Sequence, residues 1–307
     1  MPETPAVAAF AIPESRDATL RLASGAFADA FRRVLGYGAA RAAILFLVVL
    51  IALALLAPWI APYDPNATHG IVALKLQAPT LQHPFGTDAE SRDVLSRMLH
   101  GARVSLSVAV LAALLAAGVG LIYGATSGYA GGIVDDVMMR IVDASLALPR
   151  VLLLLLVFAL WREVSVFSLV VILGLTGWFP VSRLARAEAL ALSSRDFVVA
   201  ARALGAGHWR ILVRHVLPHA AGPVVVAATV AVAQVILIEA GLSFLGYGIP
   251  QPNPTWGNII RDGREWIATA WWLTVFPGLA LVGTALALNT LADRLRAALN
   301  PRQLHAP

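Results

Sequence analysis

Few residues of this chain are of a type and spacing that support enzyme chemistry. The chain has no cysteine, and its only lysine, Lys75, lies in a polar segment, so a thiolate site and a Ser/Lys catalytic pair are excluded. No G-x-x-x-x-G-K-S/T phosphate loop and no H-E-x-x-H zinc motif occurs. His208, His215 and His219 lie close together, but Pro218 separates the last two and disfavours regular helical spacing. We therefore expect no catalytic residue and no metal site.

The most informative stretch is the polar, arginine-rich segment 198–218, which lies between long apolar segments. Ala200 and Ala201 favour a helix, and Gly205 interrupts it. A second short amphipathic helix that contains Trp209 is expected to stop at Pro218. This pattern predicts a compact helix–glycine–helix loop outside the bilayer, which is typical of a site that binds another protein. The alternative is an amphipathic connector that lies on the membrane surface.

A second group of polar residues lies in or beside apolar segments and could line a transport pathway. These candidates are Gln234, Glu239, Ser243 and Asn289. The alternative for Glu239 is a carboxylate at a helix end near the external surface, paired with an arginine. A wide pathway needs few specific contacts if another protein selects the cargo.

Arg140 and Asp143 are charged residues in a segment that must lie at membrane depth. Such charges are costly in a bilayer unless they are paired or face protein. Three residues apart on a helix, they could form an ion pair at the edge of the bundle. The alternative is that they line a pathway or a gate.

The composition is that of a membrane protein that crosses the bilayer several times. Hydrophobic residues make up 59% of the chain and charged residues only 13%, whereas soluble domains have about 25% charged residues. The mean hydropathy is +0.76. The net charge of +5 comes almost entirely from arginines that flank apolar segments, so it indicates membrane topology rather than nucleic-acid binding.

The apolar runs predict an all-α membrane protein with six transmembrane helices in a domain that covers residues 41–302. Residues 1–40 and 303–307 are expected to be tails. The predicted spans are 42–60, 104–130, 136–161, 164–181, 221–239 and 271–291. Gly120 and Gly124 in the second span have the spacing that lets helices pack closely in lipid, although an alanine-rich helix without that role is an equal alternative.

Residues 61–103 form a polar segment between the first two spans. Thr87 or Asp88 is expected to cap a helix with Val94, Leu95, Met98, Leu99 and Ala102 on one face. That face is too short to cross the bilayer. It predicts a helix that packs on the external membrane surface or against a partner.

The distribution of arginines predicts which side of the membrane each loop occupies. Six spans put both ends of the chain and the loop 182–218 on one side, where the cations are unpaired. On the other side, Arg92 and Arg97 are balanced by nearby carboxylates, and Arg261 and Arg264 by Asp262 and Glu265. The positive-inside rule therefore places both ends and the arginine-rich loop in the cytoplasm. We expect a bacterial-type inner membrane.

The segment 198–218 resembles the cytoplasmic "EAA" loop of ABC importer permeases. The resemblance is carried by Ala200, Ala201, Gly205, Ile211, Leu217 and Pro218. Val199 departs from the pattern, because the family has a glutamate there. In that family the loop docks into a groove of the ATP-hydrolysing subunit. The resemblance thus implies the following coupling residues: Ala200, Ala201, Gly205, Ala206, Trp209 and Pro218.

Two further matches resemble the oligopeptide/dipeptide/nickel permeases. Residues 83–106 are similar to the segment before the second span of that family. The second match comprises 239–248, 256–258, 276–279 and 289–302. Ser91 and Arg294 depart from the family pattern, which has glycine at both positions. The arrangement resembles the second, or C-type, permease subunit of such importers.

This resemblance implies a type I ABC importer permease fold and a machine of several chains. The expected partners are a second related permease, two ATPase subunits or domains, an external substrate-binding protein and the lipid bilayer. ATP and Mg would bind the ATPase partners, and this chain would carry no cofactor. ATP binding would move the loop and tilt the spans, so that the pathway opens alternately to each side. The cargo remains open between dipeptides, longer peptides, a nickel chelate and glutathione.

Two other classes of function are weighed. A secondary transporter driven by an ion gradient needs acidic residues within the membrane and internal repeats, for which Glu239 alone is weak support. A membrane-embedded enzyme has no supporting group of residues.

Overall fold

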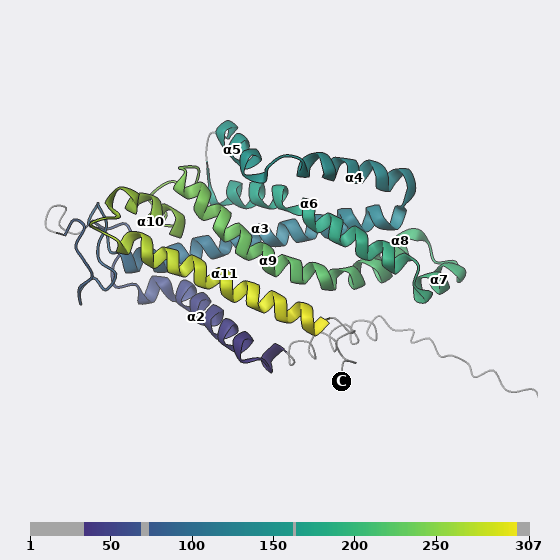
Figure 1. Cartoon of the computed structure of the whole chain (residues 1–307), viewed down its shortest axis with the longest axis horizontal. Coiled ribbons are helices and arrows are strands. Elements are labelled where there is room, and N and C mark those ends of the chain that lie inside the picture. Colours follow the sequence, from purple (N-terminus) through teal and green to yellow (C-terminus); the bar gives the residue numbers. More distant parts are fainter. Residues whose placement is uncertain (1–33, 69–73, 162–163, 300–307) are drawn as a thin grey trace, which may run out of the picture.

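The computed structural model describes residues 34–68, 74–161 and 164–299, and these residues form no β-strand. Long helices run along the long axis of the molecule (Figure 1). The elements are α2 (Gly38–Ile60), α3 (Val94–Ala130), α4 (Gly132–Leu146), α5 (Arg150–Leu160), α6 (Val166–Ser193), α7 (Asp196–Ala203), α8 (His208–Ile211), a π-helical turn η1 (Leu212–Val216), α9 (Leu217–Phe244), α10 (Trp256–Gly263), a 3₁₀ turn η2 (Arg264–Trp266) and α11 (Trp272–Leu299).

The fold agrees with the predicted all-α membrane class. Five helices are long and apolar enough to cross a membrane, and the number rises to six if the bent pair α4–α5 is counted as one span. The six predicted spans correspond to α2, α3, the bent pair, α6, α9 and α11. Residues 1–33 and 300–307 lie outside the described residues, which leaves most of the predicted tails without a structural account.

The third predicted span is broken rather than continuous. Its two helices meet at an angle of 82°, and Pro149 stands at the start of α5. Proline lacks the N–H that a continuous helix needs, and it also disfavours helical geometry in the preceding residue. The prediction of one helix over 136–161 is therefore wrong. With 11 residues, α5 reaches only about 16 Å, which is roughly half the hydrocarbon core.

The helix expected on the external surface is instead the first part of α3, which runs for 37 residues without a break. Its N-cap is Asp93, whose carboxylate accepts a hydrogen bond from the Ser96 amide at 2.8 Å. The prediction of Thr87 or Asp88 as the cap is thus wrong. Gly101 lies inside this helix where the start of α10 comes close to it, since a Cβ at Gly101 would lie 3.3 Å from the backbone of Thr255, the N-cap of α10.

Helices α3 and α6 are in close contact along a row of glycines. A Cβ at Gly120 would lie 2.7 Å from the Val181 side chain, and a Cβ at Gly124 would overlap the carbonyl oxygen of Ser182. Gly128 continues the row, since its Cβ would lie 2.5 Å from the Arg186 carbonyl oxygen. The glycines thus serve close packing, as the spacing of Gly120 and Gly124 indicated.

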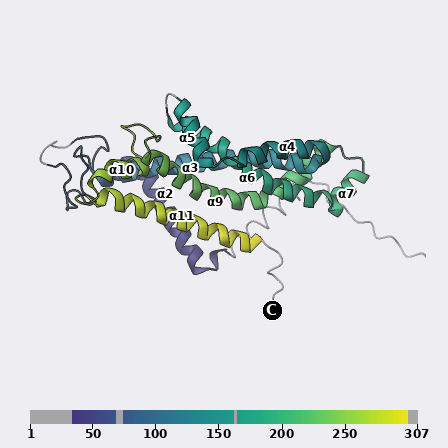
Figure 2. The ribbon, with the colours of Figure 1, turned by 45° about the horizontal axis from the view of Figure 1, so that its top comes forward.

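The two ends of the bundle carry different elements. Helix α10 lies at one end, together with the segment that precedes α3. Helices α7 and α8 lie at the opposite end (Figures 1 and 2). The first residues of α2 and the last of α11 lie away from the α10 end, on the side that carries α7 (Figure 1). This end of α6 is longer than predicted, because the helix continues past Pro180 to Ser193. The first residues of the predicted loop 182–218 therefore belong to a membrane helix.

Candidate functional site

Gly205 forms the turn between α7 and α8. Its φ of +80° lies in the left-handed region that favours glycine. The Ala206 amide donates to the Ala201 carbonyl at 3.0 Å, and the Gly205 amide donates to the Arg202 carbonyl at 3.0 Å. These two bonds form a Schellman motif, which satisfies carbonyls left free at the end of α7. The predicted helix–glycine–helix geometry is thus present in the structure.

The inner face of this loop, residues 196–216, packs on the ends of α3 and α6. Ala201 and Ala206 are half-buried and pack against the apolar cluster between the loop and these helices, so they lie on the inner face. The buried residues of the contact are Ala125, Ala189, Val198, Ile211, Leu212 and Val216. The loop is therefore seated directly on the close-packed pair of helices.

The outer face of the loop exposes large apolar side chains. Leu204 is 76% exposed, Trp209 75% and Val199 52%. Ala200 and Gly205 are exposed beside them. Val199, which stands where the resembled pattern has glutamate, thus contributes an apolar group. Leu204 is not among the residues predicted from the sequence, although its place before Gly205 at the helix end is a usable signal.

Two side-chain contacts fix the loop to the bundle. The Tyr129 hydroxyl lies 3.1 Å from Nδ1 of His208, which joins the end of α3 to the start of α8. The ring of Phe197 stacks on that of His219 with centroids 5.1 Å apart. These histidines contact aromatic residues of the loop and the bundle. Neither contact could be read from sequence spacing, because each joins residues far apart in the chain.

Pro218 does not end a helix, which corrects the sequence prediction. It is the second residue of α9, directly after the π-helical turn, and the helix continues through it to Phe244. The chain passes from α8 through the π-helical turn Leu212–Val216 into α9 without leaving helical geometry. π-Helical turns within α-helices are rare and often occur at functional sites.

Glu239 and Ser243 are fully buried between α3, α9 and α10. Glu239 accepts hydrogen bonds from the Ser243 hydroxyl at 2.8 Å and the Ser105 hydroxyl at 3.2 Å. The Trp256 amide in turn lies 3.3 Å from the Ser105 hydroxyl. Both side chains are sealed from solvent in this structure, so neither lines an open cavity here. The described partners of Glu239 are the hydroxyls of Ser105, Ser243 and Thr255, and not the arginine considered as the alternative.

The other two pathway candidates are exposed on different helices. Gln234 of α9 lines a cavity of about 200 Å³, together with residues of α3, α5, α6 and α11. Asn289 of α11 is exposed but does not line this cavity. The cavity also contains Arg150, the first residue of α5, which the sequence analysis did not select. The structure thus brings one predicted pathway residue to a cavity.

Asp143 pairs with Arg183 of α6 at 2.5 Å, not with Arg140, which corrects the predicted ion pair. A second bridge joins α4 to α6 in the same region. Arg186 donates to both oxygens of Asp135 at 2.5 and 2.6 Å, and Ser127 of α3 donates to the same carboxylate at 2.5 Å. The physical reason is that α6 extends past Pro180 and brings its arginines alongside α4.

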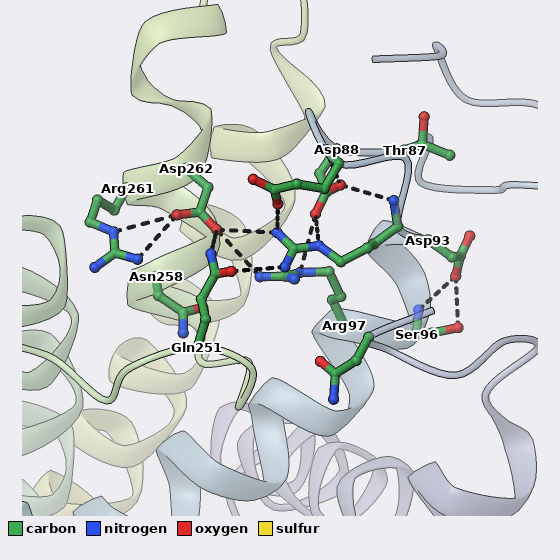
Figure 3. Close-up of polar contacts among 12 residues, drawn as sticks. Thr87, Asp88, Asp93, Ser96, Arg97, Gln251, Asn258, Arg261 and Asp262 are labelled. Atoms are coloured by element: carbon green, nitrogen blue, oxygen red, sulfur yellow. Dashed lines mark hydrogen bonds and ion pairs between the residues drawn. The ribbon is translucent and has the colours of Figure 1, made fainter. Parts of the chain in front are cut away.

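A buried ion network holds the other end of the bundle together (Figure 3). Nε of Arg92 donates to Asp88 at 2.7 Å, and Nη2 of Arg97 contacts Asp262 of α10 at 3.4 Å. Gln251 bridges this network, since it accepts from Arg92 at 3.0 Å and donates to Asp262 at 3.0 Å. The charge balance predicted for this side is therefore achieved by direct pairing.

The capping residues of α3 and α10 lie beside this network (Figure 3). Asp93 accepts from the Ser96 hydroxyl at 2.7 Å and contacts Nδ1 of His83 at 2.9 Å. Thr255 and Asn258 form a reciprocal capping box at the start of α10. Each helix start is thus fixed by its own side chains, so that Asp262 and Arg97 meet at a defined position.

Comparisons with known proteins agree with this architecture. Residues 103–305 match the family model described as binding-protein-dependent transport system inner membrane component. Residues 25–79 match the model described as N-terminal TM domain of oligopeptide transport permease C. Together the two models cover α2, all but the first nine residues of α3, and every later helix.

Several relatives are similar along nearly their whole length. A putative peptide transport system permease protein of Brucella abortus is 40% identical over 272 residues, which are 88% of this chain and 90% of the relative. A putative peptide permease protein of Brucella suis is 42% identical over 267 residues, 85% of this chain and 87% of the relative. The oligopeptide transport system permease protein OppC of Bacillus subtilis is 35% identical over 274 residues, 89% of each chain.

The fold and these matches define a membrane-spanning permease subunit of an ABC transport system. The chain belongs to the family of binding-protein-dependent transport system inner membrane components, and within it to the oligopeptide-type permeases.

Proposed function

We propose that this chain forms half of the translocation pathway of an ATP-driven importer for peptides. A second, related permease forms the other half, and an external binding protein delivers the peptide. ATP is hydrolysed on two separate subunits or domains, and the loop of residues 196–216 transmits their motion to the membrane helices. Peptide cargo is inferred from the relatives, which are named as peptide and oligopeptide permeases.

The geometry of the loop is the observation that carries this proposal. Its inner face is packed on α3 and α6, while its outer face exposes Leu204, Trp209 and Val199. An exposed apolar cluster of this kind on a polar, arginine-rich segment is typical of a protein contact. A partner that grips this face would therefore move α6 directly.

The sidedness of the chain follows from its charges. Helix α2 runs toward the α10 end of the bundle, and α11 runs away from it, toward the end that carries the loop (Figure 1). Arg202, Arg210 and Arg214 lie in this loop and Arg195 directly precedes it, and none of them has an ion pair within the described residues. Loops rich in unpaired arginines remain in the cytoplasm. We therefore assign the loop and both ends to the cytoplasmic side of the inner membrane.

The test is to isolate the tagged chain in mild detergent and identify the proteins that co-purify. The complex is then placed in proteoliposomes with its binding protein, and uptake of a labelled tripeptide is measured with and without ATP. We expect a second permease and ATP-hydrolysing subunits, and uptake that requires ATP. Uptake that proceeds on a proton gradient without ATP, or a chain that purifies alone, would contradict the proposal.

A further inference from the structure

A cavity between the long helices contains an arginine for which the described part of the chain provides no counter-charge. The cavity lies between α3, α5, α6, α9 and α11, and most of its lining is small and apolar, such as Ala116, Gly177 and Ala231. Gly177 is 11 residues from the start of α6, which places it about 16 Å from that end of the helix. Gly177 and the Arg150 side chain beside it therefore lie at the level of the middle of α6, while Arg296 borders the cavity from the last turn of α11.

Arg150 enters this cavity from the break between α4 and α5. Its Nη2 donates to the Leu173 carbonyl at 3.1 Å. Its Nε is buried and has no hydrogen-bond partner among the described residues. Gly177 provides the space for the guanidinium group, because a Cβ there would lie 2.9 Å from Nη2. The arginine is thus held in place while part of its donor capacity is unused.

The charges around the cavity leave Arg150 uncompensated. No acidic residue lines the cavity, and Arg150 has no ion pair within the part of the chain that the structure describes. Arg296, the other cation of the lining, contacts Asp293 at 3.7 Å. Gln234 adds a neutral polar group. Ionisable residues at membrane depth are costly, and they mark substrate pathways when they face a cavity.

We propose that Arg150 binds the carboxylate of the peptide cargo as it crosses the membrane. A guanidinium group presents paired N–H donors that match the two oxygens of a carboxylate. Every linear peptide with a free C-terminus carries this group. The surrounding small residues accept side chains of different sizes, which suits a pathway for varied peptides. This inference rests on the proposed function, because it assumes that the cargo is a peptide.

The experiment compares Arg150→Gln with the wild type in the assembled complex in proteoliposomes. The initial rate of trialanine uptake is measured at a fixed amount of loaded binding protein, beside basal ATPase activity. We expect uptake to fall about ten- to hundredfold, as for loss of a charge-assisted hydrogen bond, with basal ATPase activity and assembly retained. Arg150→Lys keeps the charge but not the paired donors, and should show an intermediate loss. Arg140→Gln, which removes an exposed charge from the same broken element, should leave uptake unchanged.

A second readout locates the carboxylate. A tripeptide with a photo-reactive side chain next to its C-terminal residue should crosslink to α6 or α9 in the wild type, and the crosslink should be lost in Arg150→Gln. Normal uptake by Arg150→Gln, or an unchanged crosslink, would overturn the inference while leaving peptide import intact. A wild-type complex that transports no peptide would instead contradict the proposed function.

A phospholipid phosphate is the other source of an oxyanion for this site. If a lipid were the occupant, the gently extracted wild-type complex would carry a bound phospholipid that the Arg150→Gln complex lacks, as seen by native mass spectrometry. That result would overturn the assignment to cargo. Equal lipid content in the two complexes, together with loss of uptake, would support it.

Discussion

Gly205 determines the shape of the coupling loop through its backbone alone. Its φ is +80°, and a Cβ built on it would have no heavy atom within 4 Å. Steric crowding therefore plays no part, and only the cost of left-handed geometry opposes a larger residue. That cost is about 1–3 kcal/mol for an ordinary residue and is highest for β-branched ones.

We expect Gly205→Val to abolish ATP-driven uptake while membrane insertion is retained. The valine would force the end of α7 out of the Schellman motif and redirect the exposed face of the loop. Uptake in proteoliposomes and the amount of chain in the membrane fraction measure the two effects. Gly207→Ala is the matched control, because Gly207 has a φ of −65° and open space around it. Normal uptake by Gly205→Val would contradict the role of the turn.

Glu239 is expected to stabilise the fold and to take no part in transport. Glu239→Ala removes the acceptor of the buried Ser105 and Ser243 hydroxyls, and each unsatisfied group costs about 1–3 kcal/mol. The melting temperature of the purified complex should therefore fall. Glu239→Gln keeps one acceptor oxygen, so it should lower the melting temperature less than Glu239→Ala does. A variant that loses uptake at an unchanged melting temperature would restore Glu239 as a pathway residue.

At the residue scale, the sequence predicts what depends on local geometry. Gly205 with the alanines before it predicts a helix end, and the structure confirms it. Arg150 and the pair Asp143–Arg183 could not be predicted, because they depend on how α6 packs beside α4 and α5. The sequence left Glu239 open between a pathway residue and a carboxylate at a helix end, because it does not show that Ser105 lies beside it.

At the scale of elements, the row of glycines brings α3 and α6 to backbone contact. Gly124→Ala should lower the melting temperature, because its Cβ would overlap the Ser182 carbonyl oxygen and force the helices apart. Gly118→Ala in the same helix has open space around it. It should leave stability unchanged or raise it by up to about 1 kcal/mol, since alanine favours helix over glycine. Equal effects of the two substitutions would contradict the assigned contact.

The helices themselves were only partly predictable. Hydrophobic runs located every span, but not the continuity of α3 past Gly101 or the length of α6 past Pro180. Glycine and proline both disfavour a helix interior, so neither continuation is what these residue types predict. The break at Pro149 had a signal in the sequence, because proline ends helices, but the neighbouring apolar run concealed it.

At the scale of the whole molecule, the ion network joins the start of α3 to α10. Asp262→Ala leaves Arg97, which is 1% exposed, without one of its two carboxylate partners. Breaking a buried pair in this way costs about 3 kcal/mol, so the melting temperature of the complex should fall clearly.

The control for this network is Glu265→Ala, because the Arg264–Glu265 pair at 3.9 Å is exposed. Exposed pairs contribute about 1 kcal/mol or less. Similar melting temperatures for Asp262→Ala and Glu265→Ala would show that the network does not stabilise the contact between the start of α3 and α10. The sequence predicted that charges on this side are balanced, but the partners come from segments more than 150 residues apart and could not be paired by inspection.

The contact between α3 and α6 affects how a tilt of α6 is passed on to α3. Helix α6 has 28 residues, so it is a rod about 42 Å long, and a tilt of about 5° displaces its far end by about 4 Å. Side chains that interdigitate loosely would absorb part of such a displacement. Backbones that touch along glycines transmit the displacement to α3 with little loss. We therefore expect a small movement of residues 196–216 to displace the helix ends at the opposite surface of the membrane.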